Sequence, residues 1–373
     1  MLRVSWRILA LASCVSVGVC AATQASAALL QAPQLSAAES LLAETDTGQT
    51  VVSDLANREV AIASITKMMT AYVTFKREPL QKVLVEQPYA AQPGESLAGL
   101  VPGRRYTVRE LLEAMLLPSG NDVANTLAID VAGSVPAFVA AMNRQASALG
   151  LGDTHFATPI GLDSPGNYST ARDLEKLARA LLAQPDLAAI VRKPSAYLPG
   201  GIVVRNLDPL VGYYPFVVGV KTGHTTDAGW CVVGAAREHG VHLISVVLGD
   251  PTEAVSFKDT LSLLEYGLAR FHRVSVAVAG RTYDEVPIAD STTQVALVAE
   301  HRASVVVRRG AAFAVTLVGV PRSLMGPVAA GTQEGEMEVT VGRRLVLSVP
   351  LVTATDVPAA LGVPPAPAVV SGV

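Results

Sequence analysis

The sequence predicts a mixed α/β domain, in which an antiparallel sheet lies beside a cluster of helices, followed by a small all-β domain. Apolar strands and amphipathic helices are mixed up to about residue 274, whereas beyond it the helical pattern fades and short strands follow one another. The length of 373 residues suits two domains. Because the helices are bunched between groups of strands, the first domain is not expected to be doubly wound.

The helices of the first domain are predicted from apolar spacing and start signals. Residues 64–77 carry apolar side chains three and four positions apart. Thr107-Val-Arg-Glu110 is a capping box that introduces a helix over 111–117, which Pro118 ends. Further helices are predicted over 123–132 with Asn121 and Asp122 as caps, 135–149 with Gly150 as its stop, 169–182, and 258–271.

The strands of the first domain form two expected hairpins. Apolar runs at 230–236 and 241–249 flank a short polar turn, and 40–45 can pair with 51–52. The second domain is predicted to have strands at 294–299, 304–307, 313–320, 337–341 and 345–352. It has no cluster of histidines, cysteines or paired carboxylates, so it is interpreted as a spacer or docking unit. The expected boundaries are 28–274 and 275–352, with a disordered proline-rich tail over 353–373.

The N-terminus has the features of a secretory signal peptide. Two arginines precede an apolar run over 8–22, and Ala25-Ser-Ala27 fits a cleavage site, so residues 1–27 are expected to be removed. The mature protein is then exported to the periplasm or the outside of the cell. Lipid attachment at Cys14 remains an alternative. The net charge of −3 and the lack of a basic run disfavour nucleic acid as a partner.

Cleavage would leave Cys231 as the one cysteine, so a disulfide scaffold is excluded. Cys231 lies in an apolar strand and is interpreted as a core residue rather than a nucleophile.

Three short motifs in a fixed order carry the chemistry. Ser64-Ile-Thr-Lys67 places a hydroxyl and an amine on one helix face, and Ser119-Gly-Asn121 lies in the tight connection between two helices. Lys221-Thr-Gly223 follows an apolar run that reads as a strand. This ordered triple is the motif set of penicillin-binding proteins and class A β-lactamases, with Gly120 in place of the usual Asp.

The residue types suit catalysis by a serine with a lysine base. A serine hydroxyl becomes a good nucleophile only when a base takes its proton. No Ser–His–Asp arrangement is suggested, whereas burial of Lys67 and the nearby charge of Lys221 would lower the pKa of the Lys67 amine. A role of Ser64 as a helix N-cap would not require Lys67, Ser119 and Lys221.

The strand around Lys221 is suited to binding a substrate. An edge strand can pair with an extended peptide, and Gly223 allows a close approach. Lys221 and Thr222 can meet a carboxylate, while the backbone N–H groups near His224 and of Ser64 can form an oxyanion hole.

From about residue 30 to 352, the chain resembles the D-alanyl-D-alanine carboxypeptidases among the low-molecular-mass penicillin-binding proteins. The similarity extends beyond the triple to the segments 63–70, 118–122, 161–166, 169–173 and 221–225. The resemblance implies the β-lactamase-like fold of the penicillin-recognising enzymes. It also implies removal of the terminal D-Ala from peptidoglycan stem pentapeptides through an acyl-enzyme on Ser64, and inhibition by β-lactams. Neither a metal nor a cofactor is implied.

The resemblance also assigns roles by motif. Lys67 would be the base, Ser119 and Asn121 would relay protons and hold the substrate amide, and Lys221 and Thr222 would bind the substrate. Arg205, upstream of the strand, matches an arginine that orients the substrate in the family.

Related activities are compatible with the same three motifs. A β-lactamase would need a glutamate to hold the deacylating water, and Glu175 lies in a predicted helix rather than in a loop. The same fold could also serve a D,D-endopeptidase or a non-catalytic cell-wall scaffold. Family members of this type usually end in an amphipathic helix on the membrane, which the proline-rich tail cannot form. Membrane anchoring is therefore doubtful, and only a loose association with the inner membrane is considered.

Overall fold

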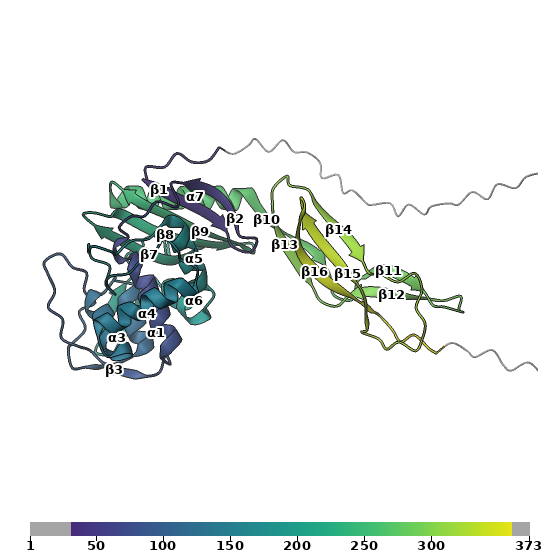
Figure 1. Cartoon of the computed structure of the whole chain (residues 1–373), viewed down its shortest axis with the longest axis horizontal. Helices are drawn as coiled ribbons and strands as arrows, with labels where there is room; N and C mark the ends of the chain where they lie inside the picture. Colours follow the sequence, from purple (N-terminus) through teal and green to yellow (C-terminus); the bar gives the residue numbers. More distant parts are fainter. Residues whose placement is uncertain (1–30, 360–373) are drawn as a thin grey trace, which may run out of the picture.

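The computed structural model describes residues 31–359, which form a larger mixed domain and a smaller β-rich domain side by side (Figure 1). The larger domain contains a five-stranded antiparallel sheet in the order β2-β1-β9-β8-β7. Its strands are β1 (Glu39–Glu44), β2 (Gln49–Asp54), β7 (Val217–Thr225), β8 (Gly229–Glu238) and β9 (Val241–Asp250). The predicted fold class is confirmed, and β7 is an edge strand.

Both faces of this sheet are covered by helices because its central strands are apolar on both sides. In β9, Ile244 and Val246 pack into the core shared with the helical cluster, whereas Leu243 and Val247 pack into a second core with Leu263 of α7 (Glu253–Arg270). This alternation follows from the period of two in a strand.

The helical cluster contains the first two sequence motifs, whereas the third, Lys221-Thr-Gly223, lies on β7. The elements of the cluster are η1 (Ala63–Thr66), α1 (Lys67–Arg77), α2 (Val108–Leu116), α3 (Asn121–Ala132), α4 (Val135–Ala148), α5 (Ala171–Leu182) and α6 (Pro185–Val191). The capping box is present, since the Thr107 hydroxyl accepts from the N–H of Glu110 at 3.2 Å and the Glu110 carboxylate from the N–H of Thr107 at 2.7 Å.

Several boundaries differ from the sequence predictions. The helix expected from residue 64 begins with a 3₁₀ turn, and Asn121 and Asp122 lie in the first turn of α3, whose N-cap is Gly120. The last helix starts at Glu253 because Thr252 caps it. Elements of three to seven residues escaped prediction because they are too short to show a period: α6 and the hairpins β3 (Val83–Val85) with β4 (Arg105–Thr107) and β5 (Ser195–Leu198) with β6 (Ile202–Arg205).

The second domain is all-β, as predicted. A five-stranded sheet has the order β11-β12-β16-β15-β14, and β10 pairs with β13. The bounds are β10 (Phe271–Ala277), β11 (Thr282–Pro287), β12 (Gln294–Ala299), β13 (Ala303–Arg308), β14 (Phe313–Val318), β15 (Gln333–Val341) and β16 (Arg344–Thr353), of which β10 and β11 were not predicted.

The expected disordered tail is corrected for residues 353–359. Thr353 completes β16, and the buried Val357 pairs with Val328. The prolines favour disorder by composition, but backbone pairing and the burial of Thr353 and Val357 order this segment. The expected signal peptide and the rest of the tail lie outside the described residues.

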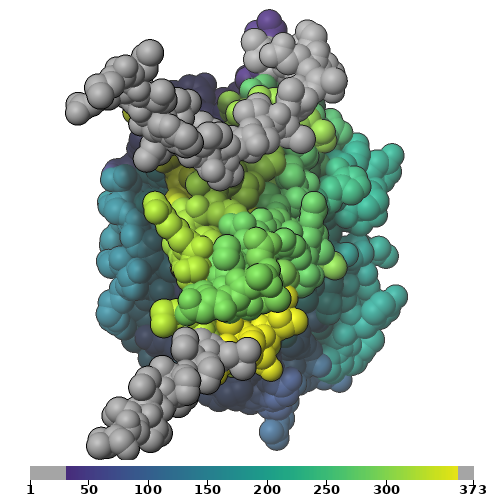
Figure 2. Space-filling model, turned by 90° about the vertical axis from the view of Figure 1, so that its right-hand side faces the viewer, coloured from purple at the N-terminus to yellow at the C-terminus, as the bar shows by residue number. Residues whose placement is uncertain are grey.

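Polar contacts join the two domains next to the turn between β1 and β2. Arg273 forms an ion pair with Asp46 and donates to the carbonyl of Gly240 at 2.8 Å, and Arg344 donates to the carbonyl of Thr47 at 2.9 Å. Seen end on, the β-rich domain (green to yellow) lies in front of the broader first domain (Figure 2).

Within residues 31–359, no single helix has both the length and the apolarity to cross a membrane; the pair α3 and α4, bent by 86°, meets those requirements only jointly, by length and composition.

Candidate active site

Ser64 and Lys67 meet at the junction of η1 and α1. The Nζ atom of Lys67 lies 2.9 Å from the Oγ atom of Ser64 and donates to the carbonyl of Ile160 at 2.7 Å. The preceding residue, Ala63, has a φ of 48°, a left-handed conformation that is strained for a residue with a Cβ atom. Ser64 makes no capping hydrogen bond, so its hydroxyl is engaged by the lysine and not by the helix end.

Lys67 is fully buried, although lysine is one of the residues that proteins bury least. Burial, and then the positive charge of Lys221, hold the pKa of the Lys67 amine well below its ordinary value, while Glu95 and Asp122 oppose this shift. A neutral amine has a lone pair, so Lys67 is chemically able to take the proton of Ser64.

The Ser119-Gly-Asn121 motif connects α2 to α3. Ser119 has a φ of 64° and is 2% exposed, and its Oγ has no partner among the described residues. The same holds for the Oδ1 atom of Asn121. A buried polar atom without a partner costs about 1–3 kcal/mol, so two such atoms in one motif are expected where a substrate supplies the missing bonds.

Strand β7 forms the other wall of the site. It lies against η1, and a Cβ atom on Gly223 would be 3.0 Å from the backbone nitrogen of Ser64. Glycine at this position therefore lets the strand approach Ser64 closely. Thr222 is half-buried, and the exposed His224 stacks on Trp230, with 4.1 Å between the ring centres.

Lys221 is also buried, at 2% exposure, and donates to the carbonyl of Thr222 at 2.9 Å. Burial lowers the pKa of the Lys221 amine to about 7, against the opposing charge of Asp208. Asp208 is 2% exposed, and burial raises the pKa of its carboxyl to about 6, although its bond from the N–H of Leu210 and the charge of Lys221 lower it. A bound carboxylate would raise the pKa of Lys221 again, because it stabilises the ammonium form.

Arg205 and Glu175 do not join this group. Arg205 is exposed at the end of β6, and its side chain makes no hydrogen bond or ion pair with another described residue. Glu175 lies in α5, where its carboxylate accepts from the Nε atom of Arg179 at 3.0 Å. Glu175 is therefore occupied within its own helix.

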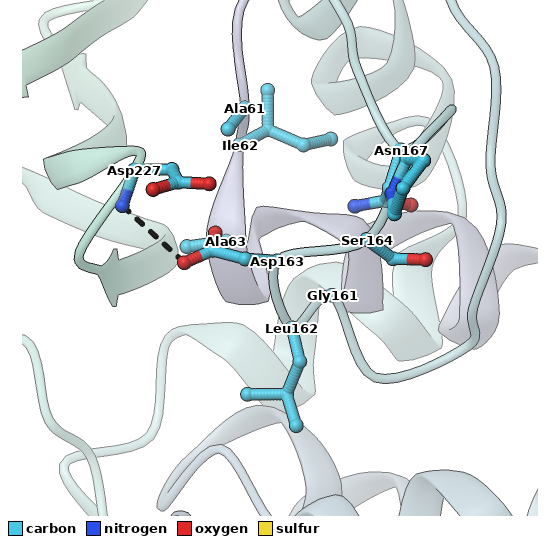
Figure 3. Close-up of a pocket in the computed structure, with 10 residues that line it drawn as sticks. Ala61, Ile62, Ala63, Gly161, Leu162, Asp163, Ser164, Asn167 and Asp227 are labelled. Carbon is cyan, nitrogen blue, oxygen red and sulfur yellow. Dashed lines mark hydrogen bonds between the residues drawn. The ribbon is translucent and has the colours of Figure 1, made fainter.

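A hollow of about 290 Å³ is lined by residues of the strained turn before Ser64 and of the loop that follows Ile160 (Figure 3). Ala63, Gly161 and Asp163 line it, and the N–H of Asp227 donates to Asp163 at 3.3 Å. Gly161 has a φ of 87°, and a Cβ atom there would be 2.1 Å from the carbonyl oxygen of Ala63. The glycine thus allows the loop that supplies the Ile160 carbonyl to reach Lys67.

The buried thiol of Cys231 takes no part in the site, because burial raises its pKa to about 12. Over residues 31–359, no group of three or more His, Cys, Asp or Glu side chains could hold a metal ion.

Sequence reasoning missed three groups. The Ile160 carbonyl cannot be predicted from a side-chain pattern. Asp208 stands 13 residues before Lys221, and Glu95 lies in an irregular loop where a glutamate normally indicates a solvated surface. Only the fold brings these groups to Lys67, Lys221 and Asn121.

A serine hydroxyl bonded to a buried lysine, between an antiparallel sheet and a helical cluster, defines the class of serine enzymes that transfer acyl groups. The model of the D-alanyl-D-alanine carboxypeptidase family matches residues 25–252, and that of the penicillin-binding protein 5 C-terminal domain matches residues 271–359. The chain belongs to the D-alanyl-D-alanine carboxypeptidase family, as the sequence resemblance predicted.

Individual relatives agree with this assignment. D-alanyl-D-alanine carboxypeptidase DacB2 of Mycobacterium tuberculosis is 37% identical over 63% of this chain and 84% of its own length. D-alanyl-D-alanine carboxypeptidase DacD of Salmonella typhimurium is 31% identical over 88% of both chains. The crystal structure of penicillin binding protein 5 from Haemophilus influenzae is 26% identical, with a TM-score of 0.66, and the match covers 88% of this chain and 99% of that one.

Proposed function

We propose that the protein removes the C-terminal D-Ala from peptidoglycan stem pentapeptides through an acyl-enzyme on Ser64. The observation that carries this proposal is the 2.9 Å contact between the Ser64 hydroxyl and the buried amine of Lys67, whose pKa is lowered. A neutral lysine at hydrogen-bond distance meets the geometric and protonation requirements of a general base.

The reaction proceeds in two steps. Lys67 takes the Ser64 proton as Oγ attacks the carbonyl of the penultimate D-Ala, and the N–H groups of Ser64 and near His224 stabilise the oxyanion. The C–N bond then breaks, and a proton delivered through Ser119 leaves with the amine of the released D-Ala. Water, deprotonated by the same lysine, hydrolyses the ester and restores Ser64. A β-lactam enters by the same attack on its ring carbonyl, and β-lactam inhibition is typical of this fold.

Lys221 and Thr222 bind the substrate's terminal carboxylate in this proposal. They lie on the strand beside Ser64. Their side chains can therefore reach a carboxylate that is one residue beyond the scissile bond, but not one that is farther away. Asn121 holds the amide on the acyl side. Arg205 keeps only the weaker orienting role that the sequence resemblance gives it, and its exposed side chain is accessible to a peptide.

Amidation of the substrate's C-terminus should slow cleavage by roughly 10²–10⁴, because two charge-assisted hydrogen bonds worth about 3–6 kcal/mol are lost. The measurement compares cleavage rates of a stem pentapeptide and its C-terminal amide, with the Lys221→Ala variant as the internal test. That variant should distinguish the two peptides by a much smaller factor, because only the hydrogen bond from Thr222 remains. Equal rates with the unaltered protein would show that no carboxylate is recognised and would favour an endopeptidase activity.

We further propose that the mature protein acts in the periplasm or outside the cell, after removal of residues 1–27. Family members are cell-wall enzymes, and the Arg-bearing apolar N-terminus supports export of this chain. The proposed division is a peptidase domain over 28–274 and a β-rich spacer or docking domain over 275–352.

Fractionation of cells that express the full chain should place the activity in the soluble exported fraction. Lys258→Ala, a change of an exposed side chain on α7, serves as a matched variant that should fractionate identically. Release of the activity only by detergent would contradict this localisation and would indicate an anchor, such as lipid on Cys14.

A further inference from the structure

Glu95 lies beside the Ser119-Gly-Asn121 motif although it belongs to none of the three motifs. It is half-buried in the loop over 86–104, which connects β3 to β4. Its Oε2 atom accepts a hydrogen bond from the Nδ2 atom of Asn121 at 2.9 Å. The neighbouring carbonyl of Ser96 accepts from the backbone N–H of Asn121 at 2.8 Å. The loop therefore holds both the side chain and the backbone of Asn121.

The contact determines which way the Asn121 amide points. An ionised carboxylate only accepts hydrogen bonds, so the NH₂ end of Asn121 must face Glu95 and the Oδ1 end must face away. That Oδ1 atom is buried and has no partner among the described residues. It is an acceptor held ready for an N–H group. With a neutral, freely rotating neighbour, the amide would be able to turn either end to the substrate.

Glu95 is itself held by further donors. The hydroxyl of Tyr89 donates to Oε2 at 2.5 Å, and the N–H of Gln92 donates to Oε1 at 3.1 Å. Burial raises the pKa of Glu95, but the bonds from Tyr89, Asn121 and Gln92, together with the charge of Lys67, outweigh it, so that the net pKa is lowered. A carboxylate engaged by three donors is poorly placed to act as a base for water, so its role is to orient.

We propose that Glu95 is a positioning residue that fixes the Asn121 amide so that Oδ1 accepts the N–H on the acyl-donor side of the substrate. This inference rests on the proposed carboxypeptidase reaction and adds a residue to it.

The charge of Glu95 has a second effect, on the general base. Three charged groups act on Lys67: Lys221 from β7, Asp122 from α3 and Glu95 from the loop. Burial and Lys221 lower the pKa of Lys67, whereas the two carboxylates raise it because they stabilise the ammonium form. Removal of the Glu95 charge lowers this pKa further. Neutral Lys67 then persists to lower pH, and the acid limb of the rate profile moves to lower pH.

Two substitutions separate these effects. Glu95→Ala removes both the acceptor and the charge, so kcat/KM for a stem pentapeptide should fall roughly 10- to 100-fold, the range for a hydrogen bond to a charged group. Glu95→Gln keeps an acceptor for Asn121 and should stay within about threefold, because a neutral acceptor still fixes the amide. Both should move the acid limb of kcat/KM to lower pH. Gln92→Ala, a change of an exposed side chain in the same loop, should do neither.

The role of Glu95 is tested by the profile of kcat/KM against pH. It is measured for the unaltered protein and for the variants Glu95→Ala, Glu95→Gln and Gln92→Ala. A role limited to loop stability would lower the melting temperature of Glu95→Ala but leave its kcat/KM, expressed per folded protein, equal to that of Gln92→Ala, and that result overturns the proposal. If Glu95→Ala does not fold, Glu95→Gln decides: a loss of kcat/KM of more than about threefold, or an acid limb left in place, overturns the proposal.

Penicillin labelling of Ser64 in each protein distinguishes a failure of the Glu95 proposal from a failure of the proposed acyl-enzyme reaction. A Ser64 adduct in every variant, with unchanged profiles, contradicts only the role of Glu95. Absence of the adduct from the unaltered protein contradicts the acyl-enzyme itself.

Discussion

Ser64→Ala should reduce the release of D-Ala by at least about 10⁴-fold, because removing the nucleophile removes the acyl-enzyme route and leaves only binding and oxyanion stabilisation. The same substitution should abolish the covalent adduct with penicillin. The fold should survive, since the Ser64 side chain makes one hydrogen bond, to Lys67.

The measurement is intact-mass analysis after penicillin treatment, followed by peptide mapping. The unaltered protein should gain one adduct, in the peptide that contains Ser64. Ser147→Ala, an exposed serine on α4, is the matched control and should label normally. An adduct that maps to Ser119, or one that persists in Ser64→Ala, would show that the nucleophile is misassigned.

Lys67→Ala should slow acylation by roughly 10²–10⁴, the usual contribution of general-base catalysis. Lys67→Arg should be equally poor, because a guanidinium does not lose its proton in the working pH range. Lys76→Ala, at an exposed position on the same helix, should acylate normally. Stopped-flow spectrophotometry with a chromogenic β-lactam measures the acylation rate. Near-normal acylation by a folded Lys67→Ala protein would rule out the role of Lys67 as the base.

The lowered pKa of Lys67 sets the direction of the pH dependence. The amine is the active base only when neutral, so acylation should fall as the pH drops through the lowered pKa. An unfolded lysine binds a proton up to about pH 10, so the unfolded chain holds more protons and stability rises with pH across this interval. Lys67→Met, which keeps the apolar stem, should therefore be inactive yet have a higher melting temperature at neutral pH.

A higher melting temperature of Lys67→Met would show that the buried amine of Lys67 lowers the stability of the fold. Burying a lysine disfavours folding at neutral pH, and the same burial keeps its amine neutral and therefore able to take the proton of Ser64. A melting temperature equal to or below that of the unaltered protein would mean that the contacts of Nζ with Ser64 and Ile160 outweigh this cost.

The sequence by itself determined the elements that depend on local pattern. Apolar periodicity predicted α1, start signals predicted α2 and α5, and continuous apolar runs predicted β8 and β9. The order of the motifs predicted the family, and their residue types predicted a chemistry of serine and lysine. These features depend on neighbours within a few positions, which is why sequence reasoning recovers them.

The tertiary structure alone decided which groups surround the motifs. Glu95, Ile160 and Asp208 come from loops whose sequences carry no pattern, and each reaches the site across more than ten residues of chain. Arg205, assigned by resemblance, instead remains exposed and unpaired among the described residues. The pKa of Lys67 depends on burial and on the sum of distant charges, which arise only when β7, α3 and the loop over 86–104 pack around it.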